Sequence, residues 1–196
     1  MRVAPITITL AAALLAPTAA APPPGLLPAG TFAIVPGDSS AAFFVPDNRG
    51  GFSGKTARVT GRVTVTQTND GYIAQVAAAI DARSLTTHVG IRDAAMRSTY
   101  LRTDRFPTIA FEGTTSAHPG LALRPFPAAV QGRLTLRDVT REERFSATVT
   151  ALSHEYLADV TTSIKMAEYG IPYPRAFIFV ARDPVTVTLQ IVARCP

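Results

Sequence analysis

Cysteine is nearly absent from this chain of 196 residues, because Cys195 is its only one. A single cysteine cannot form a disulfide within the chain, so the fold must depend on its hydrophobic core. Cys195 could link two chains into a homodimer. At the next-to-last position, however, it is more simply explained as a free thiol at a frayed terminus.

The sequence also lacks an assembled catalytic or metal-binding motif. Its histidines, His88, His118 and His154, are far apart and show none of the spacings that bind zinc. There is no G-x-S-x-G element and no plausible pairing of Cys195 with a histidine. The adjacent carboxylates of residues 142–143 are expected in a solvated turn. We therefore predict that the protein is not an enzyme and that it binds no metal and no cofactor. The alternative is an enzyme in which a single histidine acts in acid–base catalysis.

Concentrated positive charge is missing as well. Lys and Arg number 19 against 14 Asp and Glu, and the basic residues are scattered along the chain. Nucleic-acid binding usually needs a basic stripe interleaved with aromatic residues, so no nucleic-acid partner is predicted. The modest excess could attract anionic lipid surfaces without specificity, although ordinary solubility explains it equally well.

Only one long hydrophobic run is present, at residues 6–16, and it lies behind Arg2 at the N-terminus. A membrane-spanning helix needs about 20 apolar residues, whereas Pro17 interrupts this run early. The small residues that follow predict a signal peptide over residues 1–20 and export to the periplasm or medium. Residues 21–30 read as a Pro-rich spacer, and residues 31–193 as one domain without an integral membrane segment.

The predicted domain shows the alternation typical of β-strands. Over residues 58–66, Val59, Val63 and Val65 share one face with Gly61, and Arg and Thr occupy the other. Similar patterns cover residues 72–80, 128–136, 144–151 and 185–191, so we expect seven or eight strands.

Short turns between neighbouring strands favour a closed, eight-stranded antiparallel barrel, because closure removes exposed sheet edges. A β-sandwich is the alternative. The predicted inward face carries small residues that could leave an apolar lumen for one small ligand, namely Gly61, Ala74, Ala78, Ala128, Gly132 and Ala147. The same face could instead be tightly packed by phenylalanines, namely Phe43, Phe44, Phe106, Phe111 and Phe145.

One helical segment interrupts the β pattern within residues 86–106. Thr86 or Thr87 could cap it, and Pro107 should end it by residue 106. Asp93 and Arg97 have the favourable spacing for a surface ion pair. We expect this short helix to lie across one end of the barrel.

Three motifs resemble the YceI-like family of polyisoprenoid-binding periplasmic proteins. The first is Arg92-Asp93, Met96-Arg97, Leu101 and Phe106-Pro107-x-Ile109-x-Phe111, the second is residues 132–140, and the third is Glu168-Tyr169-Gly170-Ile171. The three motifs follow one another along the chain in the same order as in that family. Departures include Phe32 in place of a Trp or Tyr, and Asp138 in place of a Gly.

The resemblance implies a lipocalin-like barrel that binds an isoprenoid lipid without catalysis, such as a polyprenyl lipid or an isoprenoid quinone. The candidate lumen contacts are Phe43, Val63, Ala78, Met96, Phe111, Val130, Leu134, Phe145 and Val187. The candidate head-group contacts are Thr87, His88, Arg92 and Asp93. The alternative is a structural or partner-binding barrel in which the apolar set is plain core.

Overall fold

The computed structural model describes residues 28–119, 125–176 and 178–195. The predicted signal peptide lies outside the described residues, as do residues 21–27 of the predicted spacer. Residue 30 of that spacer already belongs to the first strand.

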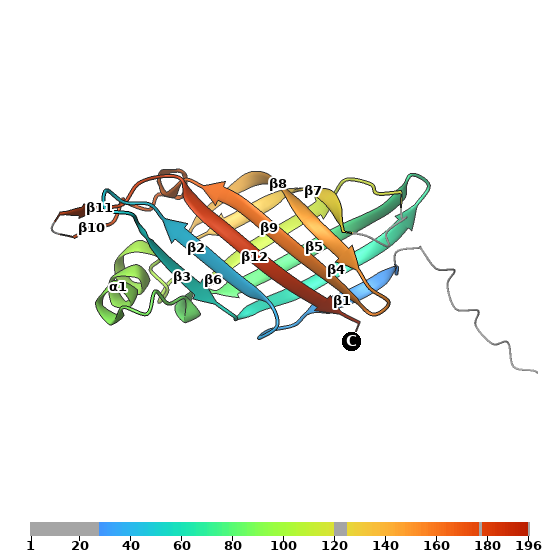
Figure 1. Cartoon of the computed structure of the whole chain (residues 1–196), viewed down its shortest axis with the longest axis horizontal. Coiled ribbons are helices and arrows are strands. Elements are labelled where there is room, and N and C mark those ends of the chain that lie inside the picture. Colours follow the sequence, from blue (N-terminus) through green and yellow to red (C-terminus); the bar gives the residue numbers. More distant parts are fainter. Residues whose placement is uncertain (1–27, 120–124, 177, 196) are drawn as a thin grey trace, which may run out of the picture.

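Eight strands form a closed antiparallel barrel (Figure 1). They pair in the order β1-β4-β5-β6-β7-β8-β9-β12, and the ring closes because β12 also pairs with β1. Their bounds are β1 Gly30–Ile34, β4 Val59–Thr68, β5 Gly71–Asp81, β6 Thr108–Thr115, β7 Phe126–Leu136, β8 Val139–Ala151, β9 Glu155–Ile164 and β12 Val185–Arg194. The predicted barrel is confirmed, and the sandwich alternative is wrong.

Two further strands, β2 (Ser40–Val45) and β3 (Phe52–Thr56), continue β1 and β4 beyond a kink. β2 pairs with the first half of β12, and β1 with its last residues. The fully buried Ser39 fixes the kink, because its hydroxyl donates to the Val192 carbonyl at 3.2 Å and accepts from the Val192 N–H at 3.0 Å. The alternating patterns of the sequence did not indicate β3.

Alternation along the strands places most side chains on the predicted faces, with exceptions at Phe44, Gly61 and Gly132. On β4, Val59 and Val65 are buried while Arg62 is exposed. A Cβ at Gly132 would collide with the Glu112 carbonyl, and one at Gly61 with the Ala77 carbonyl. These two glycines are therefore small because neighbouring strands approach closely, and neither lines the lumen.

The helical interruption is shorter than predicted. It consists of η1 (Ala82–Ser84), α1 (Gly90–Ala95) and η2 (Met96–Tyr100), a turn of π-helix. The predicted threonine cap is wrong, because the N-cap is Val89 and makes no side-chain hydrogen bond there. None of the helices in the described part of the chain is long and apolar enough to cross a membrane.

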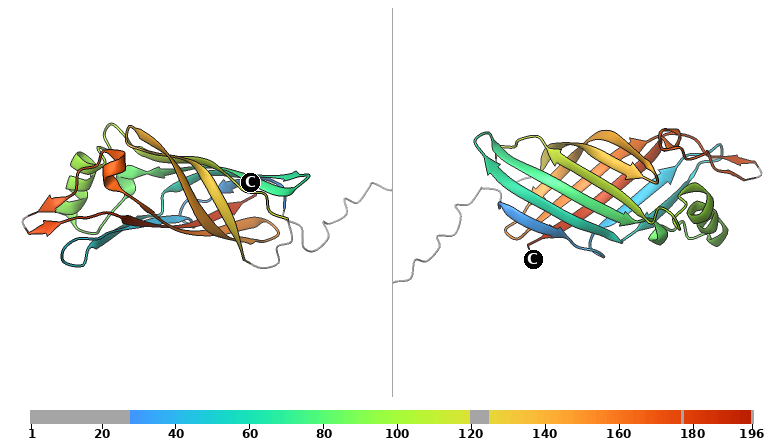
Figure 2. Two further views of the ribbon diagram at one scale, coloured as in Figure 1. Left: turned by 90° about the horizontal axis from the view of Figure 1, so that it is seen from above. Right: turned by 180° about the vertical axis from the view of Figure 1, so that it is seen from behind.

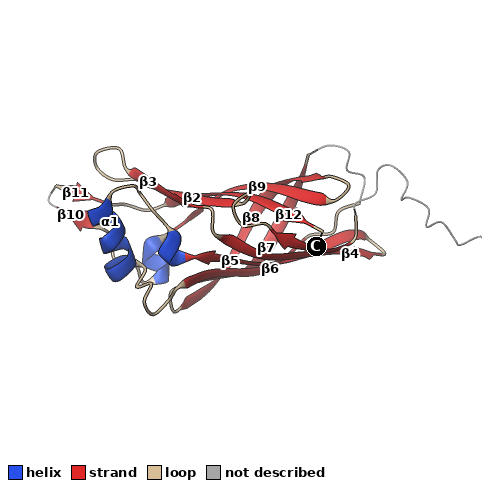
Figure 3. Cartoon of the chain, turned by 90° about the horizontal axis from the view of Figure 1, so that it is seen from below, coloured by secondary structure: helices blue, strands red, loops and turns tan. Residues whose placement is uncertain are grey.

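All helices of the described residues lie toward one end of the barrel, together with the hairpin of β10 (Arg175–Ala176) and β11 (Phe179–Val180) (Figures 2 and 3). The short η3 (Met166–Tyr169) belongs to the same end. We call this the helix end. Its connections are residues 46–51, 82–107, 137–138 and 165–184. The opposite, far end holds the β4–β5 and β8–β9 turns and the C-terminus (Figure 1).

Candidate ligand-binding cavity

A cavity of about 720 Å³ occupies the barrel, and its wall is almost entirely apolar. Valine, leucine, isoleucine, alanine and phenylalanine from the inward faces of the strands supply most of that wall. All nine predicted lumen residues line it: Phe43, Val63, Ala78, Met96, Phe111, Val130, Leu134, Phe145 and Val187. Contact between these side chains and a ligand stays a prediction.

The cavity remains open because small and large side chains share the wall. Ala74, Ala78, Ala128 and Ala147 line it and leave space that larger residues would fill. Of the five phenylalanines considered for a packed core, three line the cavity wall. Phe44 instead points outward with 38% of its surface exposed. The described barrel therefore holds a lumen and not a filled core.

Aromatic residues pack the far end of the lumen. The rings of Phe32 and Tyr156 meet edge to face at 4.9 Å between centroids, and both side chains are buried. The Tyr156 hydroxyl donates to the Pro28 carbonyl at 2.7 Å. Burial raises the pKa of Tyr156, with Tyr72 nearby adding to the effect, so the phenol stays neutral.

At the helix end the cavity reaches the surface, because exposed side chains such as Arg49, Ile91 and Arg175 are among its lining residues. Arg92 also lines it, and its guanidinium carbon lies 4.4 Å from the centre of the Phe52 ring. That cation–π contact holds α1 against the start of β3. The charged lining residues therefore gather at the mouth, where Arg49, Arg92 and Arg175 outnumber Asp47 and Glu143, whereas the depth of the cavity is apolar.

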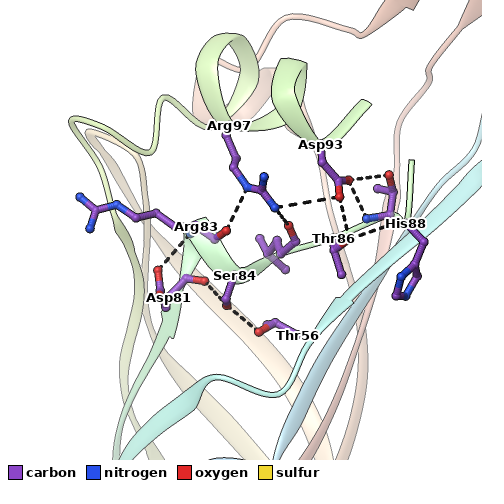
Figure 4. A network of polar contacts seen from close by, with 10 residues as sticks. Thr56, Asp81, Arg83, Ser84, Thr86, His88, Asp93 and Arg97 are labelled. Carbon is purple, nitrogen blue, oxygen red and sulfur yellow. Dashed lines mark hydrogen bonds and ion pairs between the residues drawn. The ribbon is translucent and has the colours of Figure 1, made fainter. Parts of the chain in front are cut away.

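A buried carboxylate anchors the helix beside this mouth (Figure 4). Asp93 accepts hydrogen bonds from the Thr86 hydroxyl at 2.6 Å, the Thr87 hydroxyl at 2.6 Å and the Thr87 N–H at 2.7 Å. Arg97 lies 4.0 Å from the same carboxylate and donates to the carbonyls of Arg83 and Leu85. The predicted Asp93–Arg97 pair is confirmed.

The electrostatics of Asp93 follow from this network. Burial alone would raise its pKa, but the hydrogen bonds from Thr86 and Thr87, together with the charge of Arg97, lower it from 3.8 to about 2. Asp93 is therefore charged at neutral pH, and both of its oxygens are occupied.

The four predicted head-group residues separate in the structure. Arg92 alone lines the cavity. Thr87 and Asp93 are buried and bonded to each other, which favours a structural role in holding the helix. His88 is exposed beside them with a φ of +59° and does not line the cavity. Head-group contact stays a prediction, and the geometry favours Arg92.

Several mouth residues escaped the sequence reasoning. Arg49 and Arg175 lie in connections without regular patterning, so no sequence signal placed them at the cavity. Glu143 belongs to β8 and not to a turn, since the connection between β7 and β8 spans only residues 137–138. It lines the cavity and accepts a hydrogen bond from the Tyr169 hydroxyl at 2.6 Å. Burial and the adjacent Glu143 raise the pKa of Tyr169.

The three sequence motifs converge at the helix end. Leu136 of the second motif and Tyr169 and Ile171 of the third are buried in one cluster, against which Leu101 and Ile109 of the first pack. Arg137 of the second motif also donates to the Gly170 carbonyl at 2.8 Å. The motifs therefore build the mouth of the barrel.

The histidines do not converge on a shared site. His88 and His154 are exposed, while His118 lines the cavity near the far end and stacks on Phe126 at 3.9 Å between ring centroids. Among the described residues, no group of three or more His, Cys, Asp and Glu side chains could hold a metal ion. The arrangement is suited to enclosing an apolar molecule.

Comparison with known proteins adds a family and a fold. The family model for the YceI-like domain matches residues 32–193. A search of curated proteins found no match.

Solved structures that resemble this one include the following three. A polyisoprenoid binding domain from Saccharophagus degradans, implicated in plant cell wall breakdown, is 16% identical, with a TM-score of 0.67 over 84% of this chain and 98% of that chain. Burkholderia cenocepacia BcnA is 14% identical, with a TM-score of 0.64 over 81% and 98%. A Campylobacter jejuni YCEI protein is 10% identical, with a TM-score of 0.52 over 70% and 81%. At these identities the likeness shows the fold.

Proposed function

The chain belongs to the YceI-like domain family, and from that premise we propose that it binds and carries an isoprenoid-type lipid in its lumen. A polyprenyl lipid or an isoprenoid quinone fits the site best. The observation that carries this proposal is the apolar cavity of about 720 Å³ inside the barrel. The polyisoprenoid binding named for the Saccharophagus degradans domain supports the same choice of ligand.

The size of the cavity bounds the buried part of the ligand. A water molecule occupies about 30 Å³ in the liquid, so 720 Å³ holds roughly two dozen atoms of that size. At five carbons per unit, this corresponds to about five isoprene units. A longer chain would leave its remainder outside the mouth.

Polar recognition is expected only at the mouth. An isoprenoid chain has no hydrogen-bonding groups, so burial of its apolar surface supplies the affinity at about 25 cal/mol per Å². Arg49, Arg92 and Arg175 surround the opening and are placed to meet a polar or anionic head group. We include Arg92 as a head-group contact and add the other two arginines.

We further propose that the protein is exported and acts without chemistry on its ligand. The N-terminal run of residues 6–16 supports export. His118 is the histidine at the cavity, where its ring stacks on that of Phe126. A structural or partner-binding barrel with a filled core is disfavoured by the open lumen.

Native mass spectrometry of the protein recovered from the exported fraction of a bacterial host tests the proposal. A reproducible apolar adduct is expected, and organic extraction should release a lipid built from isoprene units. If every preparation is empty, and neither a polyprenol nor an isoprenoid quinone binds to the delipidated protein, lipid carriage is wrong.

A further inference from the structure

Exposed apolar side chains gather at the helix end of the barrel. Among described residues, six large hydrophobic side chains are exposed, and four of them lie in helix-end connections. Ile91 and Val89, at the start of α1, have exposed fractions of 85% and 40%. Ile178 and Tyr173, in and beside the β10–β11 hairpin, reach 56% and 40%. A gathering of exposed apolar side chains at one end of a protein is typical of a surface that meets another protein or a membrane.

Positive charge gathers at the same end. The helix-end connections contain ten Lys and Arg residues and six Asp and Glu residues, whereas the β4–β5 and β8–β9 turns of the far end contain one charged residue, Asp70. Several helix-end carboxylates are engaged within the protein. Asp93 is buried, and Asp183 accepts hydrogen bonds from the Met166 N–H and the Tyr173 hydroxyl. Within the described part of the chain, Arg92 and Arg175 form no ion pair, so no carboxylate within 4.0 Å balances their charge.

Direct contacts join these residues into one rim. The side-chain amide of Asn48 donates to the Ile178 carbonyl at 2.8 Å, and its oxygen accepts from the Val180 N–H at 3.0 Å. The connection of residues 46–51 is therefore bonded to the β10–β11 hairpin. On its other side, Arg92 of α1 stacks on Phe52 at the start of β3. Figures 1 to 3 agree that α1 and the hairpin project from the same end of the barrel.

We propose that this rim docks on an anionic phospholipid bilayer. The rim patch consists of Arg49, Val89, Ile91, Arg92, Tyr173, Arg175 and Ile178. Its apolar side chains enter the interface between head groups and acyl chains, and its arginines meet the lipid phosphates.

Charge and shape together favour a membrane as the occupant. The patch is basic, and phospholipid surfaces in bacteria carry negative charge. Its exposed apolar residues belong to two separate segments, the start of α1 and the β10–β11 hairpin with its flank, which project from the same end of the barrel (Figures 1 and 3). If the lumen holds a lipid, as proposed above, docking would also place the cavity mouth against the bilayer, where an apolar cargo could enter without crossing water.

Vesicle sedimentation of the exported protein tests the patch. The probes are vesicles of phosphatidylglycerol with phosphatidylcholine, and vesicles of phosphatidylcholine alone. Binding is expected to the first kind, to weaken with salt and to fall at least about tenfold for Ile91→Asp or Ile178→Asp. Arg175→Ala should weaken binding about fivefold, and only on the anionic vesicles.

Matched controls lie away from the rim. Leu152→Asp changes an exposed apolar residue at the far end, and Arg62→Ala removes an exposed arginine from the outer wall of β4. Both should bind vesicles like the parent protein. Equal losses in the controls, or equal binding to both kinds of vesicle, would overturn the proposal. The proposal would also be overturned if the parent protein bound neither kind of vesicle and instead formed a dimer that Ile91→Asp dissociates.

The result can be separated from the proposed cargo by repeating the assay with Ala128→Phe, which obstructs the lumen. Retained vesicle binding in that variant supports the rim patch even if no lipid is ever found inside the barrel. Loss of vesicle binding in Ala128→Phe would contradict a docking surface that acts through the rim.

Discussion

Ala128→Phe is the substitution that best tests whether the lumen binds the ligand. Ala128 lies near the start of β7, is 8% exposed and lines the cavity toward its far end. Its neighbour Ala129 is exposed on the outer wall of the same strand. The same substitution at the two positions therefore adds the same atoms to opposite faces of one strand.

The expected effect follows from volume. The substitution adds six carbon atoms, or about 180 Å³ at roughly 30 Å³ each, which is about a quarter of the 720 Å³ cavity. The lumen would then lose space for about one isoprene unit. At about 0.8 kcal/mol for each buried carbon, the five carbons of that unit are worth about 4 kcal/mol, or up to roughly a thousandfold in affinity.

Titration of delipidated protein with isoprenoid alcohols of increasing length measures this effect. Ala128→Phe should bind the longer chains far more weakly and lose less affinity for the shorter ones, because the far end is where space is removed. Ala129→Phe should bind all lengths like the parent, and circular dichroism should show β structure in both. Equal affinities for the two variants, or an equal loss at every chain length, would refute the assignment of the lumen.

Two further substitutions concern the mouth of the barrel. Asp93→Asn should lower the free energy of unfolding by about 2 kcal/mol at neutral pH, since the folded-state pKa of Asp93 is about 2 against an ordinary value of 3.8. That contribution is complete above about pH 4 and is lost as pH falls toward 2, so a deficit independent of pH in urea unfolding would contradict it. Tyr169→Phe removes the donor to Glu143 and should cost about 1–3 kcal/mol. Part of that loss should return with Glu143→Gln, and a cost unchanged in the double variant would contradict the assigned bond.

Much of the barrel could be predicted because its wall follows a simple period. Alternation placed Val59 and Val65 inside and Arg62 outside, since each residue of a strand faces opposite to the next. The same rule fails at Gly132, where the neighbouring strand, and not the lumen, requires a small residue. Periodicity gives the side a residue faces, but it carries no information on how closely two strands approach.

The mouth was less predictable because it is made of irregular connections. Arg175 lines the cavity because it belongs to a short hairpin that packs at the mouth. No local sequence pattern predicted that hairpin. Asp93 looked like a surface residue in a polar run, yet the threonines expected to cap the helix turn inward and bind it. The burial and the role of charged residues in such positions depend on tertiary contacts, which the local sequence does not reveal. Only the family resemblance pointed to this segment as a whole.

Isotope-filtered NMR most directly tests whether the lumen is the binding site. The probe is a polyprenol of about five isoprene units, added to delipidated protein with labelled methyl groups. Bound-chain protons should give nuclear Overhauser effects to the methyls of Met96 near the mouth, Leu134 in the wall and Ala128 toward the far end. Effects confined to Ala129 or other outward methyls, or none at saturating polyprenol, would contradict lipid binding inside the barrel.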